Sequence, residues 1–361
     1  MGSKSTRKNV YNASRDEQGN NQFLKVAGHL VNYASSKFKR KTRQTAPPPP
    51  PPMSASGGVT YTPGNGYKYH RFSQPNSDNF VVSSLSPDTN RNKIDILIVA
   101  GGGSNSTPAP YTGGAGAGGV VHATNVAIPA ATTYPVGVGA GGATGPSTRN
   151  NGADSTFGGH PIGTITAKGG GYGGFYPGNN ANPGGSGGGK QDAPDVSGNA
   201  LQPGQNSSWT PQPGFNQYGS PGGGGGTTGA YHAPGGGGAS EPGGASPPSQ
   251  SSDQTGGYGG RGQPIPGFEY PLIGLDPIDV PTEANSPTSN HYGGGGMGWG
   301  YANHPDPARM RAYGGGATNN RGSASSPPYG PQNGTDGLGG GAGASGGGKG
   351  GDGIVVIRYQ T

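Results

Sequence analysis

Glycine is the residue that most constrains this chain, because 81 of its 361 residues are Gly. They gather in islands that alternate with polar, proline-rich segments carrying aromatic side chains. Gly has no Cβ and loses more conformational freedom on folding than any other residue, so the islands cannot form an ordinary hydrophobic core. A flexible linker, in turn, has no use for the bulky residues between them. The islands are residues 101–103, 113–119, 137–142, 169–174, 184–189, 222–226, 235–238, 256–260, 293–300, 314–316 and 337–351.

The composition allows two opposite interpretations. Only 27% of the residues are hydrophobic, and the chain has 37 Pro besides its Gly, which is typical of low-complexity disorder. Against disorder, only 11% of the residues are charged, and 18 Tyr, 8 Phe and 2 Trp are spread along the chain. Disordered segments are usually poor in aromatic residues. We therefore predict an ordered body, with a disordered glycine-rich wall or condensate protein as the alternative.

The sequence excludes several kinds of site. The chain has no Cys, so it can form neither disulfides nor thiolate metal sites. Its seven His show no metal-ligand spacing, and we expect no metal and no cofactor. No apolar run reaches the roughly 18–20 residues of a membrane helix, and no apolar stretch of a signal peptide follows Met1. A protein exported without a signal can leave its cell inside a virus particle released by lysis.

The first 46 residues differ from the rest. They carry ten Lys and Arg against Asp16 and Glu17, so the net charge of +6 resides at this end. Apolar residues at helical spacing between Phe23 and Phe38 predict one α-helix, with basic residues at its C-terminal end that complement the helix dipole. A lone amphipathic helix must bury its apolar stripe, and we predict that it is a docking helix for a surface outside the body. The docking candidates are Phe23, Leu30, Val31, Phe38, Lys37, Lys39, Arg40 and Lys41.

A proline run separates this segment from the body. Pro47–Pro52 predicts a stiff polyproline II spacer of roughly 18 Å, and we assign residues 47–58 to the linker. The alternative is that the helix packs back on its own body. The body itself is divided into a β-rich base, residues 59–145, and a glycine-rich part, residues 146–361, whose closing strand covers 353–359.

Strand patterns lie mainly in the base and at the C-terminal end. Gly64-Asn65-Gly66 predicts a hairpin turn. The continuous apolar runs of residues 94–100, apart from Asp95, and 354–357 suit strands covered on two faces. We expect these two strands to be neighbours, so that the last strand closes the body. The predicted strand segments are 79–85, 93–103, 118–129, 133–142, 162–171 and 351–359.

The islands predict a second kind of regular structure. Polyproline II geometry has three residues per turn and no internal hydrogen bonds, so every backbone group points outward. Without Cβ atoms, such helices approach closely and satisfy these groups on their neighbours. Each net hydrogen bond contributes about 0.5–1.5 kcal/mol, while ordering a residue costs about 1–2 kcal/mol. The expected fold is therefore mostly β or irregular: a small sheet region that stabilises a bundle of polyglycine II helices with long loops.

A resemblance supports this expectation. The segments "IDILIVAGGG", "GGAGAGGVV", "YPVGVGAGG", "STFG", "AKGGGYGG" and "GGDGIVVIRY" resemble the glycine-rich domains of tailed-bacteriophage fibres, over residues 59–361. The chain is also similar in plan to the glycine-rich tail-fibre adhesins of T-even-like phages. The resemblance implies a sandwich of polyglycine II helices whose loops contact a host receptor. This chain departs from that plan in its longer, proline-richer loops and its basic N-terminal segment.

The resemblance gives the aromatic segments a function. It implies that they bind a host cell-surface polysaccharide or outer-membrane protein from the exterior of the virion, as a possible homo-trimer. Tyr and Trp offer a large contact area at low entropic cost, and Arg adds directional hydrogen bonds. The alternative for each ring is that it packs over the scaffold as a substitute core. The receptor-binding candidates are Trp209, Phe215, Tyr218, Tyr231, His232, Phe268, Tyr270, His291, Tyr292, Trp299, Tyr301, His304, Arg309, Arg311 and Tyr313.

Enzyme motifs fail on inspection. A G-x-G-x-x-G match begins at Gly114, but no helix-forming segment follows it. Two near-matches to a phosphate loop have Gln191 and Gly350 where Ser or Thr is required. The Arg residues among the glycines are too few for an RNA-binding segment, and we expect no specific nucleic acid. We predict a non-enzymatic fibre or adhesin, with a structural capsid or tail decoration or adaptor protein as the alternative.

Overall fold

A computed structural model gives the structure of the protein. The chain divides into two units, residues 1–49 and 50–361, and the elements below all belong to the second. The predicted basic helix and its docking candidates lie outside the described residues. The structure describes residues 48–76, 78–106, 112–145, 148–175, 180–190, 215–224, 232–246, 256–275, 290–300, 314–317, 333–344 and 347–361.

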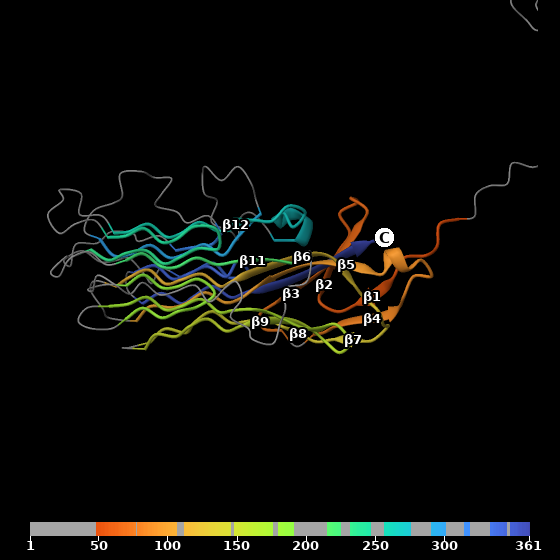
Figure 1. The fold of residues 1–361 in the computed structure, drawn as a ribbon, viewed down its shortest axis with the longest axis horizontal. Coiled ribbons are helices and arrows are strands. Elements are labelled where there is room, and N and C mark those ends of the chain that lie inside the picture. The colour runs from red at the N-terminus through yellow and green to blue at the C-terminus, as the bar shows by residue number, and fades with distance from the viewer. Residues whose placement is uncertain are drawn as a thin grey trace, which may run out of the picture. The chain divides into compact units, whose positions relative to one another are not determined.

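The unit is built around an antiparallel six-stranded sheet with the order β11-β6-β5-β14-β3-β2 (Figure 1). The C-terminal strand thus lies inside the sheet, between β5 and β3. Ile354 pairs with Val99 of β5 and with Ser73 of β3. The strands are β2 (Val59–Tyr61), β3 (Tyr67–Ser73), β5 (Lys93–Val99), β6 (Val120–Ala127), β11 (Phe215–Tyr218) and β14 (Ile354–Gln360).

Smaller sheets accompany the central one. Two have three strands, in the orders β1-β4-β7 and β10-β9-β8, and a third pairs β12 with β13. The described helices are two short 3-10 turns, so this part of the chain is mostly β. The bounds are β1 (Ser54–Ser56), β4 (Phe80–Ser84), β7 (Thr133–Tyr134), β8 (Val136–Gly137), β9 (Ser155–Gly159), β10 (Gly163–Ala167), β12 (Gln263–Pro264), β13 (His291–Tyr292), η1 (Thr89–Arg91) and η2 (Tyr270–Ile273).

The main strand predictions are confirmed. The two apolar runs pair as neighbours in β5 and β14. The predicted hairpin joins β2 to β3, and the Asn65 side chain supports its turn by accepting from the Tyr67 N–H at 3.2 Å. One boundary is earlier than expected. Met53 is buried, and β1, inside the segment assigned to the linker, pairs with β4.

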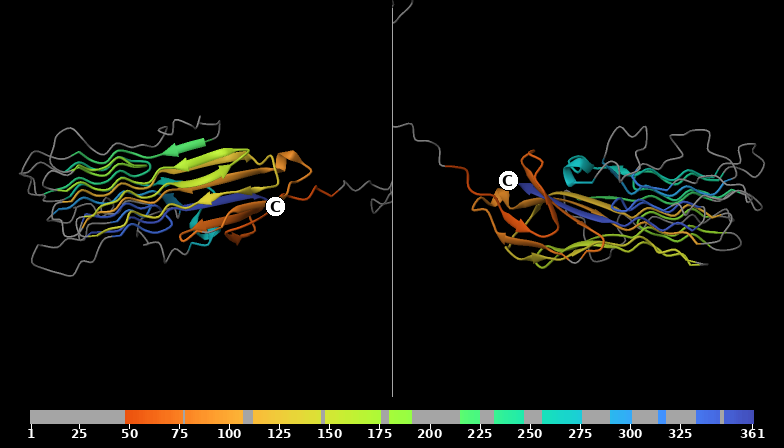
Figure 2. Two further views of the ribbon diagram at one scale, coloured as in Figure 1. Left: turned by 90° about the horizontal axis from the view of Figure 1, so that it is seen from below. Right: turned by 180° about the vertical axis from the view of Figure 1, so that it is seen from behind.

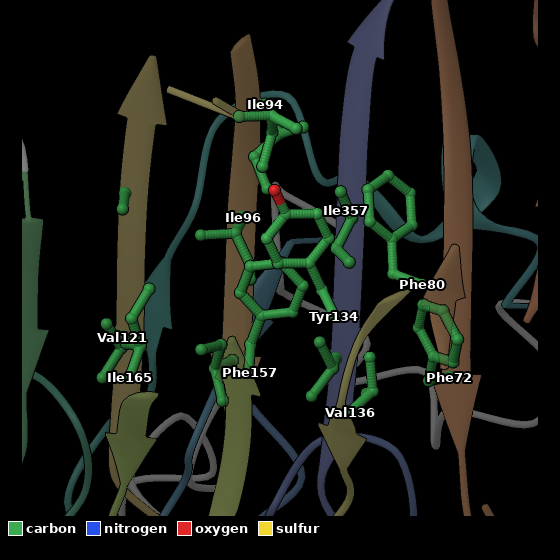
Figure 3. Close-up of a cluster of buried hydrophobic side chains, with 14 of the residues drawn as sticks. Phe72, Phe80, Ile94, Ile96, Val121, Tyr134, Val136, Phe157, Ile165 and Ile357 are labelled. Carbon is green, nitrogen blue, oxygen red and sulfur yellow. The ribbon is translucent and has the colours of Figure 1, made fainter. Parts of the chain in front are cut away.

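One face of the central sheet packs on the two three-stranded sheets (Figure 3). Ile96 of β5 and Ile357 of β14 contribute from the central sheet, and Phe80, Tyr134 and Phe157 contribute from the smaller sheets. The Tyr134 and Phe157 rings stack with their centroids 6.1 Å apart. All five side chains are fully buried, so this layer is an ordinary hydrophobic core.

The opposite face is covered as well. Leu97 and Val356, which alternate with the residues of the first core, pack against the segment that includes Phe268 and η2. Successive side chains of a strand point to opposite faces, so a strand buried on both sides needs an unbroken apolar run. That is why the runs in β5 and β14 are continuous.

Candidate functional site

Beyond the central sheet, the chain continues into glycine-rich tracts that belong to no helix or strand. Residues 100–106 follow β5, and residues 347–353 lead into β14. Figures 1 and 2 show these extended tracts side by side, running away from the sheet in one direction. We call them the glycine array. It comprises residues 100–106, 112–119, 138–145, 148–154, 168–175, 180–190, 219–224, 232–246, 256–262, 293–300, 314–317, 338–344 and 347–353.

The hydrogen bonds of tract 113–119 repeat every three residues. Its backbone N–H groups donate in rotation to three other tracts, and every third donor reaches the same one. The donor–acceptor distances are 2.7–3.0 Å. A conformation with three residues per turn and outward-pointing N–H groups produces this rotation. The donor–acceptor pairs are Gly113–Gly174, Gly116–Gly171 and Gly119–Lys168; Gly114–Pro234 and Ala117–Gly237; and Ala115–Ala342 and Gly118–Gly339.

The carbonyl groups of the same tract accept from three further tracts. The acceptor bonds span 2.8–3.0 Å. Tract 113–119 therefore lies among neighbours on all sides, and nearly all its backbone groups are paired without any side chain. The donor–acceptor pairs are Gly189–Gly114, Ser186–Ala117, Gly296–Ala115, Gly103–Gly116 and Ala100–Gly119.

Close approach of backbones, not unusual φ angles, explains the glycines in this tract. None of them has a positive φ. A Cβ added at Gly114 would lie 1.9 Å from the carbonyl oxygen of Gly296, and one at Gly116 would lie 2.2 Å from that of Ser186. Ala115 is nevertheless fully buried in the same tract, so a methyl group fits at some positions of the array and not at others.

Several tracts meet at the far end of the array, which we define by Thr112, Phe175, Ala233, Trp299 and Ala344. Thr112 forms a β-bridge with Phe175, and its hydroxyl donates to the Ala344 carbonyl. The Trp299 N–H donates to the Thr112 carbonyl at 3.0 Å, and the Ala233 N–H donates to Trp299 at 2.8 Å. Segments that are remote in sequence are thereby held side by side.

Sequence reasoning missed one cluster beside this end. The Arg149 guanidinium lies over the rings of Tyr172, at 4.8 Å, and Phe175, at 4.5 Å. It also donates to the Gly173 carbonyl at 3.0 Å. All three side chains are half-buried. The signal for this cluster was present in the sequence, since Tyr172 interrupts a glycine island and Phe175 directly follows it.

The structure places three receptor-binding candidates in the interior. Phe268 and Tyr292 are fully buried, and Tyr270 is 6% exposed, all in the second core. Burial raises the pKa of Tyr292 well above its ordinary value, and its hydroxyl donates to the Phe268 carbonyl at 2.6 Å. These positions favour the alternative considered for the rings, packing over the scaffold. They are closed to a ligand that approaches from outside.

The other receptor-binding candidates that the structure describes differ in how far they are buried. Trp299 is half-buried at the far end, and His291 is half-buried in β13. Phe215 and Tyr218 of the edge strand β11 are half-buried and pack on opposite cores. His232 is buried, which lowers its pKa. Outside the described residues lie Trp209, Tyr231, Tyr301, His304, Arg309, Arg311 and Tyr313.

Two other kinds of feature, a metal-binding cluster and a membrane-spanning helix, do not occur among the placed residues. These residues include no group of three or more His, Cys, Asp or Glu that could hold a metal ion. No helix among them is long and apolar enough to span a membrane.

Comparison with known proteins gives one match. A family model described as "Glycine-rich domain" matches residues 77–360, which include the central-sheet strands β5, β6, β11 and β14 and the glycine array. A search of curated proteins finds no match.

Proposed function

The chain belongs to the glycine-rich domain family, and on that premise we propose that it is a fibre or adhesin protein of a tailed-bacteriophage particle. In this proposal the glycine array is a bundle of polyglycine II helices, and its far end carries the receptor-contacting segments. The three-residue hydrogen-bond repeat around tract 113–119 is the observation that carries the proposal. It supports a rigid scaffold made from residues that otherwise favour flexibility.

The sequence adjoining the far end supports a recognition role. Residues 301–313 directly follow the half-buried Trp299 and the buried Gly300, and contain Tyr301, His304, Arg309, Arg311 and Tyr313. Such side chains dominate the binding energy of protein interfaces. A backbone fixed at the far end by hydrogen bonds reduces the entropy that a presented segment loses on binding. We therefore assign receptor contact to this segment before any other.

The remaining roles follow from this proposal. The basic segment 1–46 docks on other virion proteins, and the far end faces a host polysaccharide or outer-membrane protein. The protein is then exposed on the particle exterior, as one copy or as a homo-trimer. The alternative is a decoration or adaptor protein whose exposed segments contact other virion proteins. The resemblance of the glycine-rich segments to phage adhesins favours the adhesin.

Replacing the proposed contact segment tests this function. Residues 301–313 are exchanged for a Gly/Ser segment of equal length, and the labelled full chain is tested for binding to a panel of bacterial strains. We expect binding to a susceptible strain to be lost while the melting temperature stays unchanged. Strains stripped of surface polysaccharide distinguish a polysaccharide receptor from a protein receptor.

A matched control is available in the same chain. Residues 247–255, "PPSQSSDQT", contain no aromatic residue and follow Ser246, whose N–H lies 3.4 Å from the Gly224 carbonyl. The same exchange there is expected to leave cell binding unchanged. Equal binding by both variants and the unaltered chain would contradict the adhesin proposal. Binding to assembled particles alone would establish the adaptor alternative.

A further inference from the structure

A pocket of about 260 Å³ opens at the end of the central sheet that is remote from the glycine array. Its lining residues include members of η1 and the last residues of β14, the strand whose end at the C-terminus is marked in Figures 1 and 2. Four strands and η1 contribute to its wall. The lining residues are Tyr67, Asn90, Arg91, Lys93, Asp95, Thr124, Asn125, Arg358, Tyr359 and Gln360.

The wall carries an excess of positive charge. Arg358 and Asp95 neutralise each other, with Nε 3.0 Å from Oδ2. The second oxygen of Asp95 accepts from the backbone N–H of Asn125 at 2.9 Å, so the carboxylate is fully engaged. Within the part of the chain that the structure describes, Lys93 and Arg91 form no ion pair. Among the placed residues, these two cations therefore face the pocket without a counter-charge.

The pocket is rigid on its Arg358 side. The guanidinium donates to the Gly267 carbonyl at 2.7 Å and lies 4.5 Å from the centre of the Tyr67 ring and 4.9 Å from that of Phe268. Asn125 has a φ of 56°, a left-handed conformation that Asn tolerates and that is stabilised here by the bond to Asp95. A wall held in this way loses little entropy when a ligand binds.

The size and polarity of the pocket limit its ligand. Its volume is below the roughly 300–1,000 Å³ of sites for drug-sized molecules, so it accommodates about one ring. Amide and hydroxyl groups of Asn90, Thr124 and Gln360 line it beside Tyr67, an arrangement that suits a ring bearing hydroxyl groups. The Arg91 guanidinium donates to the Pro50 carbonyl, which carries no formal charge, so both cations still attract an anionic substituent.

We propose that this pocket binds a single anionic sugar, with Lys93 and Arg91 holding its carboxylate or phosphate. None of the lining residues belongs to the far end of the array, so the site is independent of the proposed receptor contacts. A carboxylate and a phosphate are both anions that these cations can bind. The experiment below distinguishes them by using one sugar that carries a carboxylate and one that carries a phosphate.

Titration by NMR tests the proposal on the full chain. Methyl β-glucuronide, glucose 1-phosphate and neutral methyl β-glucoside are added separately, and the shifts of the pocket amides are followed. We expect at least one anionic sugar to bind at least tenfold more tightly than the glucoside, and the tighter one identifies the anion. Equal affinities, or no binding of either anionic sugar, would overturn the proposal.

Two variants assign the binding to the pocket. Lys93→Gln combined with Arg91→Gln is expected to weaken the anionic sugar at least fivefold and leave the glucoside unchanged. Lys168→Gln removes one cation from an exposed pair with Asp154 outside the pocket and is the control. Equal weakening by the control and the pocket variants would place the binding elsewhere and refute the assignment. Because cell binding through residues 301–313 is measured separately, failure of one proposal does not affect the other.

Discussion

His70 of β3 stacks on Tyr359 of β14, with ring centroids 5.7 Å apart and an interplanar angle of 24°. The Phe80 ring meets His70 edge-on at 5.2 Å, and the Gly57 carbonyl lies 2.7 Å from Nδ1. This neutral imidazole is enclosed by the first core. Burial lowers the pKa of His70 from 6.5 to about 4.

The buried imidazole predicts loss of stability in mild acid. Below pH 6.5 the unfolded chain takes up a proton at His70, whereas the folded chain does so only near pH 4. The free energy of unfolding should therefore fall between pH 6.5 and 4, by about 3 kcal/mol from this group. Urea unfolding at several pH values measures the slope. His70→Gln should flatten it, and an unchanged slope in that variant would assign the acid sensitivity to other groups.

The ion pair of Asp95 and Arg358 predicts a second stability effect. Each side chain is only 14% exposed. Asp95→Asn should lower the free energy of unfolding by about 2 kcal/mol, less than the roughly 3–5 kcal/mol for a fully buried pair. Glu241→Gln in the exposed pair with Arg261 is the control, and should change stability by less than about 1 kcal/mol. Equal losses of stability in the two variants, measured by thermal unfolding, would show that the Asp95–Arg358 pair stabilises the fold no more than the exposed pair does.

Two Gly-to-Ala substitutions distinguish the cost of disturbing close backbone packing from the general effect of replacing Gly with Ala. Gly116→Ala places a methyl group against the Ser186 carbonyl, and overpacking of this kind costs about 1–3 kcal/mol or more. Gly224→Ala meets nothing within 4 Å and should change stability by less than about 1 kcal/mol. Thermal unfolding of both variants is the measurement. A Gly116→Ala protein as stable as the Gly224→Ala protein would contradict the packing described for tract 113–119.

The elements that could be predicted from the sequence are those with a recognisable pattern, such as a continuous apolar run or a glycine-containing turn. The strands β5 and β14 were found because burial on both faces requires continuous apolar runs, and the β2–β3 hairpin because Gly64 and Gly66 suit its turn. Short strands such as β11 and β13 have too few residues for a pattern to emerge. Burial of Phe268 and Tyr292 stayed an alternative in the sequence, because neither ring belongs to an alternating or continuous apolar pattern that marks a buried face. The partners of each tract were also unpredictable, since repeated Gly has no side chain to distinguish one register from another.

Hydrogen exchange of the glycine amides measures whether the glycine array is a rigid scaffold. The N–H groups of residues 113–119 all donate to backbone carbonyls within the array. If these bonds form a rigid scaffold, the amides should exchange at least about 1,000-fold more slowly than in an unstructured peptide, comparable with those of β5 and β14. NMR or mass spectrometry of the full chain gives these rates. Exchange at the unstructured rate in this tract, with the strands still protected, would contradict the account.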